Sequence, residues 1–291
     1  MKSLEESITT AMESRDIELV PFFPYILQDF WELGTPAETV IELVQRHYSV
    51  EETTISICHC ELDPQSPKKP NADNQGIAGQ VRNDKLKFHR LRVLDLGCGK
   101  GAVSVKLAAA LKCNCLGIDG IPEFIEISKK KAHEYGVENL CRFEVGDIRK
   151  KIEELGKFDV IILGAIGQVF GDYFSTLTTL SKHLETEGII IINDAYIEDS
   201  SSFIHPQVFP RKELLKQIMQ AGMEIVDEHA GGEDHEEYVR QFENIQKRCK
   251  ELIVKYPDKI SLFENYIKTQ AEEYDALENK MIGSIMVLKK I

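Results

Sequence analysis

The sequence lacks the features that would assign it to a membrane or to a nucleic acid. No apolar run approaches the roughly 18 residues that a membrane-spanning helix needs, and the opening MKSLEESITTAMES has no apolar core like that of a secretory signal. Basic residues are few, because 35 Lys and Arg stand against 48 Asp and Glu and leave a formal net charge of −13. Binding to phosphate backbones requires a surplus of cations. We therefore expect neither a membrane nor a nucleic acid as partner.

The sequence also lacks an ordered cysteine framework. Seven cysteines, an odd number, are scattered over 291 residues, which argues against disulfides and favours a reduced cytoplasm. The C-x-C pairs, Cys58 with Cys60 and Cys113 with Cys115, do not have the C-x-x-C spacing of zinc knuckles, and no metal is expected. A thiol role for Cys58 and Cys60 stays open. The contents of 43% hydrophobic and 29% charged residues are typical of a soluble globular protein.

Three segments of the chain differ in composition. Residues 1–60 are apolar and aromatic at helical spacing, which predicts an N-terminal helical cap. Within it, Thr35 before Pro36 predicts a helix with Thr35 as its N-cap. Residues 61–84 are polar and predict a surface loop or linker. Residues 85–291 then alternate apolar runs with helical patterns and predict one large α/β domain.

The apolar runs of this domain predict a mostly parallel sheet. Runs such as FDVIILG and GIIIIND are apolar throughout, which is typical of central strands covered on both faces. Strands are predicted at Arg92–Leu96, Asn114–Asp119, Cys141–Val145, Asp159–Leu163, Gly188–Asn193, Met223–Asp227 and Gly283–Lys289. Helices are predicted between them at Ala102–Lys112, Pro122–Tyr135, Asp147–Leu155, Tyr173–Leu184 and Arg211–Ala221.

An acidic helical insertion, residues 231–281, separates the last two predicted strands. Two apolar stripes run along it at helical spacing, namely Tyr238, Phe242, Ile245, Cys249 and Leu252, and Phe263, Tyr266, Ile267, Tyr274 and Leu277. The stripes suit a hairpin packed on the sheet or on a second subunit, and equally a lid over a substrate. Both interpretations stay open, and the first includes a homodimer formed through the insertion.

The stretch RVLDLGCGKGAVSV reads as a strand, a glycine turn and a helix, the pattern of a nucleotide-like ligand site. Gly97, Gly99 and Gly101 let a ligand approach the backbone closely. Their spacing suits either a dinucleotide or S-adenosylmethionine (SAM). Asp95 separates these ligands, since a carboxylate there repels a pyrophosphate but attracts the ammonium and sulfonium groups of SAM.

Further candidate ligand contacts follow the second and third predicted strands. Asp119 ends the second strand, where a carboxylate can accept from both ribose hydroxyls of either ligand. In the segment VGDI, Asp147 can accept from an adenine amino group, while Ile148 and Ile121 can cover the two faces of the ring. An Asp after a strand is also a common helix N-cap. Only the full set in this order favours SAM.

With VLDLGCGKG, GIDGI, VGDI, LGAIGQVFGDY and LETEGIIIIND, the chain resembles the class I SAM-dependent methyltransferases from about residue 92 to residue 194. The resemblance implies a Rossmann-like, seven-stranded, mostly parallel sheet with an antiparallel last strand, and a cap formed by the N-terminal segment. It also implies SAM as cofactor and S-adenosylhomocysteine (SAH) as product. The cofactor-binding residues that it implies are Asp95, Gly97, Cys98, Gly99, Gly101, Asp119, Gly120, Ile121, Asp147, Ile148, Leu163 and Gly164. The insertion departs from the family pattern.

The methyl acceptor is expected to be a small molecule that receives the methyl group by in-line displacement. LGAIGQVF, after the fourth strand, lacks the Asn/Asp-Pro-Pro-Tyr/Phe segment of enzymes that methylate bases or glutamine. Substrate candidates are Tyr25, Asp29, Trp31, Phe170 and Tyr196, and catalytic candidates are Asp194, Tyr196, His229 and His235. Core packing of the N-terminal aromatics and a solvated loop around His229, Glu233, Asp234 and His235 stay open as alternatives. Two other functions also stay open, a SAM-binding module without turnover and a nicotinamide-dependent oxidoreductase, which Asp95 and Asp147 disfavour.

Overall fold

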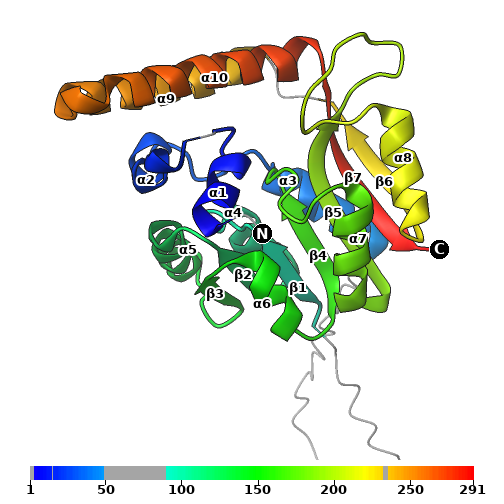
Figure 1. Ribbon diagram of the computed structural model, residues 1–291. Coiled ribbons are helices and arrows are strands. Elements are labelled where there is room, and N and C mark those ends of the chain that lie inside the picture. The colour runs from blue at the N-terminus through cyan, green and yellow to red at the C-terminus, as the bar shows by residue number, and fades with distance from the viewer. Residues whose placement is uncertain (1–2, 15, 49–89, 232–234) are drawn as a thin grey trace, which may run out of the picture.

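The computed structural model describes residues 3–14, 16–48, 90–231 and 235–291, which are coloured in Figure 1. The predicted polar loop, the pair Cys58 and Cys60, and the pair Glu233 and Asp234 lie outside the described residues. No helix within the described ranges is long and apolar enough to cross a membrane.

Seven strands form one sheet in the order β3-β2-β1-β4-β5-β7-β6 (Figure 1). Their bounds are β1 Arg92–Leu96, β2 Asn114–Asp119, β3 Cys141–Val145, β4 Phe158–Gly164, β5 Leu184–Tyr196, β6 Met223–Ala230 and β7 Ile282–Lys290. The first five strands pair in parallel, whereas β7 lies antiparallel between β5 and β6. The predicted fold class is confirmed. The strand order reverses between β1 and β4, which is where open α/β sheets bind ligands.

Helices cover both faces of the sheet because neighbouring side chains of a strand point to opposite sides. One face packs under α3 Ala37–His47, α4 Ala102–Leu111 and α5 Pro122–Glu134. The other packs under α6 Ile148–Lys151, α7 Tyr173–Leu180 and α8 Arg211–Gln220, with short 3-10 turns at η2 Ile152–Glu154 and η3 Ser181–His183. Val93 and Leu94 of β1 thus belong to different cores. This arrangement explains why the central strands are apolar throughout.

The N-terminal cap and the helical insertion pack against each other. Their elements are α1 Leu4–Ala11, η1 Ile17–Phe22, α2 Phe23–Ile26, α9 His235–Lys255, η4 Pro257–Lys259 and α10 Ile260–Asn279. Figure 1 shows α9 and α10 as a long pair that extends above α1 and α2. Phe263 and Tyr266 of α10 are buried in one core with Phe23. The apolar stripes that suggested a homodimer are therefore largely covered by the chain's own cap.

The start of α3 differs from the prediction. Its N-cap is Pro36, whose side chain makes no capping hydrogen bond. The Thr35 hydroxyl instead accepts a hydrogen bond from Asn193 Nδ2 at 3.0 Å, and Glu32 accepts one from the Ala37 N–H at 3.2 Å. Thr35 thus links the cap to β5 because its hydroxyl points toward the sheet and away from its own helix.

β5 and β6 are longer than predicted, because β7 pairs with β5 as far as Ile282, which lies opposite Tyr196, and with β6 as far as Ser284. That residue lies opposite Asp194 on one side and opposite Ala230 on the other. Asp194, Tyr196 and His229 consequently lie on strands and not in the loops that the sequence suggested. The backbone that carries these three side chains is therefore fixed by the pairing of the sheet.

Packing of the hairpin on the cap can be tested with Phe263→Ala. Phe263 is fully buried, so we expect its truncation to lower the free energy of unfolding by about 3–5 kcal/mol, measured by urea titration. Val254→Ala, at a position that is 84% exposed on the same hairpin, is the control and should change it by less than about 0.5 kcal/mol. Equal effects of the two variants would show that the hairpin does not pack in this way.

Candidate cofactor and acceptor site

A cavity of about 430 Å³ follows the carboxyl edge of the sheet across the switch point. Its walls come from α1, the glycine turn, the ends of several strands and the α9–α10 hairpin. We call one part the turn side, defined by Gly97, Gly99, Asp119 and Asp147. The other part is the hairpin side, defined by Glu13, Asp194, His205 and Glu273.

The glycine turn is held open toward the cavity by its backbone. Gly97 and Gly99 have φ angles of 71° and 53°, a left-handed conformation that favours glycine. The Asp119 carboxylate accepts from the N–H of Gly99 at 2.9 Å and from the N–H of Ile121 at 2.8 Å. Burial raises the pKa of Asp119 to about 6. One carboxylate thus fixes the turn after β1 and the turn after β2 in a single arrangement.

Asp95 lies behind the turn and does not line the main cavity. Its carboxylate accepts from the Ser104 hydroxyl at 2.6 Å, and burial raises its pKa to about 6. It shares a cavity of about 30 Å³ with Cys98 and Trp31. Trp31 donates from Nε1 to the Lys100 carbonyl at 3.1 Å. Trp31 therefore packs the cap against the turn and does not reach the main cavity.

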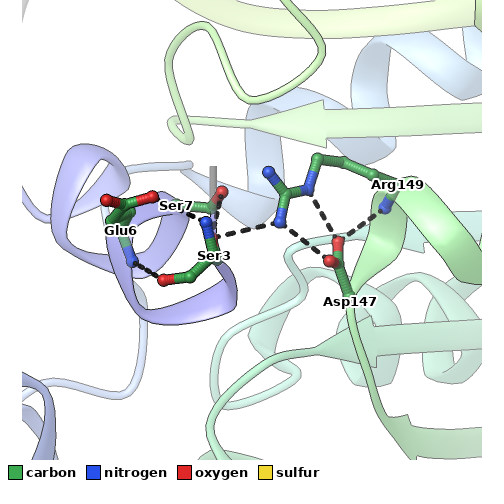
Figure 2. Close-up of polar contacts among 5 residues, drawn as sticks. All are labelled: Ser3, Glu6, Ser7, Asp147 and Arg149. Atoms are coloured by element: carbon green, nitrogen blue, oxygen red, sulfur yellow. Dashed lines mark hydrogen bonds and ion pairs between the residues drawn. The ribbon is translucent and has the colours of Figure 1, made fainter. Parts of the chain in front are cut away.

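Asp147 is a helix N-cap, as the sequence analysis left open, and it also lines the cavity. Its side chain caps α6 by accepting from the Arg149 N–H at 3.1 Å, and it pairs with the Arg149 guanidinium at 2.8 Å, which lowers the pKa of Asp147. Figure 2 shows the same guanidinium donating to the Ser3 carbonyl, at 3.1 Å, where α1 begins. Ser3 and Glu6 complete a capping box. Arg149 therefore ties α1 to the turn side, with Ile148 buried beside it.

The end of β4 is crowded and leaves no room for a side chain. A Cβ at Gly164 would lie 2.5 Å from the Thr35 hydroxyl, so the cap approaches the strand through this glycine. Asn193 donates to the Gly34 carbonyl at 2.8 Å and holds the same segment. Leu163 instead lines a smaller adjoining cavity of about 20 Å³.

The hairpin side brings Asp194, a predicted candidate, together with three polar residues that the sequence analysis did not select, namely Glu13, His205 and Glu273. Glu13 has a φ of 48°, a conformation that non-glycine residues rarely adopt. Burial, and to a smaller extent repulsion by the Glu273 carboxylate, raises the pKa of Glu13 to about 7. His205 Nε2 lies 3.5 Å from a Glu273 carboxylate oxygen, and Glu273 raises the pKa of His205. Asp194 accepts from the Tyr173 hydroxyl at 2.8 Å, and burial raises its pKa.

Several predicted acceptor residues lie away from the cavity. Tyr25 donates to Glu251 at 2.7 Å and Asp29 pairs with Arg248 at 2.6 Å, so both fasten the cap to the hairpin. Tyr196 packs below the Arg211 guanidinium, 4.5 Å from its ring centre. The residues left outside the cavity walls are Tyr25, Asp29, Trp31, Phe170, Tyr196 and His235, of which Phe170 packs on a core and His235 pairs with Glu278. Only Asp194 and His229 among the candidates line the cavity.

A signal for the missed residues is present in the insertion. Gln270 and Glu273 interrupt the second apolar stripe at positions four and seven residues after Tyr266, where helical spacing places them on the same face. A polar side chain on a buried helix face indicates a partner there. Glu13 and His205 had no such signal, because they lie outside periodic segments. Within the described ranges, no group of three or more His, Cys, Asp or Glu is placed to hold a metal ion.

Comparison with known proteins gives the family. A family model described as a methyltransferase domain matches residues 87–283. An uncharacterized methyltransferase of Bacillus subtilis, YcgJ, is 29% identical over 44% of this chain and 50% of its own. A ubiquinone biosynthesis O-methyltransferase of Colwellia psychrerythraea is 27% identical over 60% of this chain and 66% of its own. The chain thus spans about half the length of the curated relatives it matches.

A solved structure supports the same fold. The SAM-dependent methyltransferase of Geobacter sulfurreducens, crystallised with SAH, superposes with a TM-score of 0.58 at 20% identity, over 69% of this chain and 85% of its own. Because the family model matches more than half of the chain, the chain belongs to the methyltransferase-domain family. Its family and fold place it among the class I SAM-dependent methyltransferases, whose cofactor is SAM. The predicted resemblance is confirmed.

The link between α1 and the turn side can be tested with Arg149→Gln. The variant loses the hydrogen bond to Ser3, so we expect the amides of α1 to exchange with deuterium about five- to tenfold faster, as local opening becomes easier by about 1 kcal/mol. Lys150→Gln removes the same charge from an exposed neighbour and should leave this exchange unchanged. Identical exchange in wild type and Arg149→Gln would contradict the link.

Glu13 makes stability depend on pH. Its pKa rises from 4.5 to about 7 in the folded protein, so between these values the unfolded chain ionises first and stability falls as pH rises. At pH 8 the penalty is almost fully present and is about 3 kcal/mol. We expect Glu13→Gln to lose less stability than wild type between pH 5 and pH 8 in urea titrations. A parallel pH dependence in both proteins would be evidence against the buried carboxyl.

Proposed function

We propose that the protein is an enzyme that transfers the methyl group of SAM to a small molecule. The observation that carries this proposal is one continuous cavity. Its turn side contains the residues that the family resemblance assigns to SAM, and its hairpin side offers polar groups within largely apolar walls. Its volume of about 430 Å³ falls in the range of small-molecule sites. The cap and the hairpin cover it, which supports a small acceptor over a macromolecule.

The turn side fits SAM in shape and in charge. A Cβ at Gly97 would lie 2.7 Å from Ile166, so only glycine fits between the turn and this side chain, and both residues line the cavity. Each Asp119 oxygen accepts one backbone N–H and keeps a second lone-pair site for a ribose hydroxyl. The buried side chains of Ile121 and Ile148 line the same cavity and suit the faces of an adenine ring.

Asp95 fits the cofactor in a less direct way than the resemblance implies. Its carboxylate lies beneath the turn and is bonded to Ser104. From there it adds negative charge behind Gly97, which favours a cationic methionine moiety. We propose that Asp95 stabilises the turn and acts on the cofactor through its field rather than by direct contact.

The chain contributes mainly orientation and the exclusion of water. When bound, SAM supplies a methyl group on a sulfonium, and the bond to sulfur breaks as the acceptor lone pair forms the new bond. Phe30 and Leu33 of the cap close the cavity above the turn, and Asn193 holds the cap at the end of β4. A general base is required only for an acceptor that arrives protonated. Asp194, His205 and His229 line the cavity and are the candidates.

The cytoplasm is the compartment that we propose. All five cysteines of the described ranges are free, and Cys113 and Cys115 lie with their sulfurs 3.6 Å apart without a bond. Five free thiols, three of them buried, support a reducing environment.

Asp119→Asn tests the proposed cofactor site. Loss of the charge weakens hydrogen bonds to the ribose, so we expect the affinities for SAM and SAH in isothermal titration to fall at least about tenfold. Asp258→Asn, at an exposed turn of the hairpin, serves as the control. Unchanged affinity in Asp119→Asn would exclude this role for Asp119. Failure of the wild-type protein to bind either SAM or SAH would overturn the proposed function.

A further inference from the structure

Apart from two histidines, the ionisable acid and base side chains described in the cavity walls are carboxylates and tyrosines. Among the described residues that line it there is no Lys and no Arg. Six carboxylates line it, namely Glu13, Glu32, Asp119, Asp147, Asp194 and Glu273. Glu32 pairs with Lys106, and Asp147 pairs with Arg149. An anionic acceptor such as a phosphate or a carboxylate would therefore enter a cavity without a fixed cation to receive it.

Three of these carboxylates converge on the hairpin side from distant parts of the chain. Glu13 comes from the segment after α1, Asp194 from the end of β5, and Glu273 from α10. Glu273 and Asp194 both raise the pKa of Glu13 by repulsion, in addition to burial. His205 is the one basic group that affects the pKa of Glu13, and it lowers that pKa. Its Nε2 atom lies 3.5 Å from a Glu273 carboxylate oxygen. One imidazolium cannot neutralise three carboxylates.

A hydrogen-bond acceptor in the same wall also lacks a donor. Gln207 Oε1 is buried and finds no donor among the residues that the structure describes. Gln207 lines the cavity two residues after His205. A buried acceptor without a donor is costly, so a ligand that brings N–H groups to this wall would relieve it. The wall there also includes the apolar side chains of Met12, Leu277 and Met281.

We infer that the methyl acceptor carries a cationic amine on an apolar body, and that Glu13, Asp194 and Glu273 bind this amine on the hairpin side. The inference rests on the proposed function. An ammonium group supplies both positive charge for the carboxylates and N–H donors for Gln207. The apolar body then lies along the cap and the hairpin. A ligand of this kind also explains why a strained residue, Glu13, is retained with its carboxyl inside the cavity.

The test uses the full-length protein saturated with SAH and three probes of similar size. The probes are 2-phenylethylamine, 2-phenylethanol and 3-phenylpropionate, which are cationic, neutral and anionic. By isothermal titration at about pH 8, above the pKa of about 7 of Glu13, we expect the amine to bind at least about tenfold more tightly than the alcohol. The carboxylate should bind most weakly. At about pH 6 the preference for the amine should shrink, because Glu13 is then largely protonated.

Two variants test whether the carboxylates of the hairpin side cause the preference for the amine. Glu13→Gln and Glu273→Gln should each lower the affinity for the amine about tenfold and leave that for the alcohol nearly unchanged. Glu272→Gln removes an exposed carboxylate next to Glu273 and should leave both affinities unchanged. SAH affinity and the thermal midpoint, measured for every variant, establish that the turn side and the fold are intact.

The outcomes separate the two proposals. If SAH binds but the amine shows no advantage over the alcohol, or shows no binding at millimolar concentration, the inference is overturned and the proposed function stands. An amine preference that survives both Glu13→Gln and Glu273→Gln also overturns it. If the wild-type protein does not bind SAH, the proposed function fails first, and this result appears before any amine is added.

Discussion

The site depends on the buried carboxylate of Asp119. By accepting from the N–H groups of Gly99 and Ile121, it joins the turn after β1 to the turn after β2. These turns belong to neighbouring parallel strands, whose carboxyl ends meet at one edge of the sheet. Burial disfavours the ionised form of this carboxylate and raises its pKa. A ligand that satisfies its remaining lone pairs would offset part of that cost.

The cap and the hairpin turn this open edge into a cavity. The buried Lys100 ammonium donates to the Leu27 and Phe30 carbonyls and fastens the cap to the glycine turn. Asp29 and Arg248 fasten the cap to the hairpin. The hairpin side exists only where these two additions meet the sheet. Glu13 and Glu273 come from these additions, whereas Asp194 and His205 come from the sheet and the segment that follows β5.

Carboxylates that are chemically alike have different pKa values in this cavity because their surroundings differ. Asp147 lies beside the Arg149 guanidinium, which lowers its pKa. Glu13 lies among other carboxylates away from water, and its pKa rises to about 7. One end of the cavity thus holds acids with partners in the chain, and the other holds acids that lack enough positive charge nearby. This difference is the physical basis for assigning them to different ligands.

The sequence by itself determined the sheet, the glycine turn and the family, because apolar runs, glycine spacing and acids at strand ends are local patterns. It also predicted the hairpin, whose stripes have helical period. Only the tertiary structure decided the hairpin side, since Glu13, His205 and Glu273 are far apart in the chain and meet through packing. Tyr196 shows the same limit on one strand. It extends β5 by pairing with β7 and lies on the same face of the strand as Asp194, yet its ring packs against Arg211 and does not line the cavity.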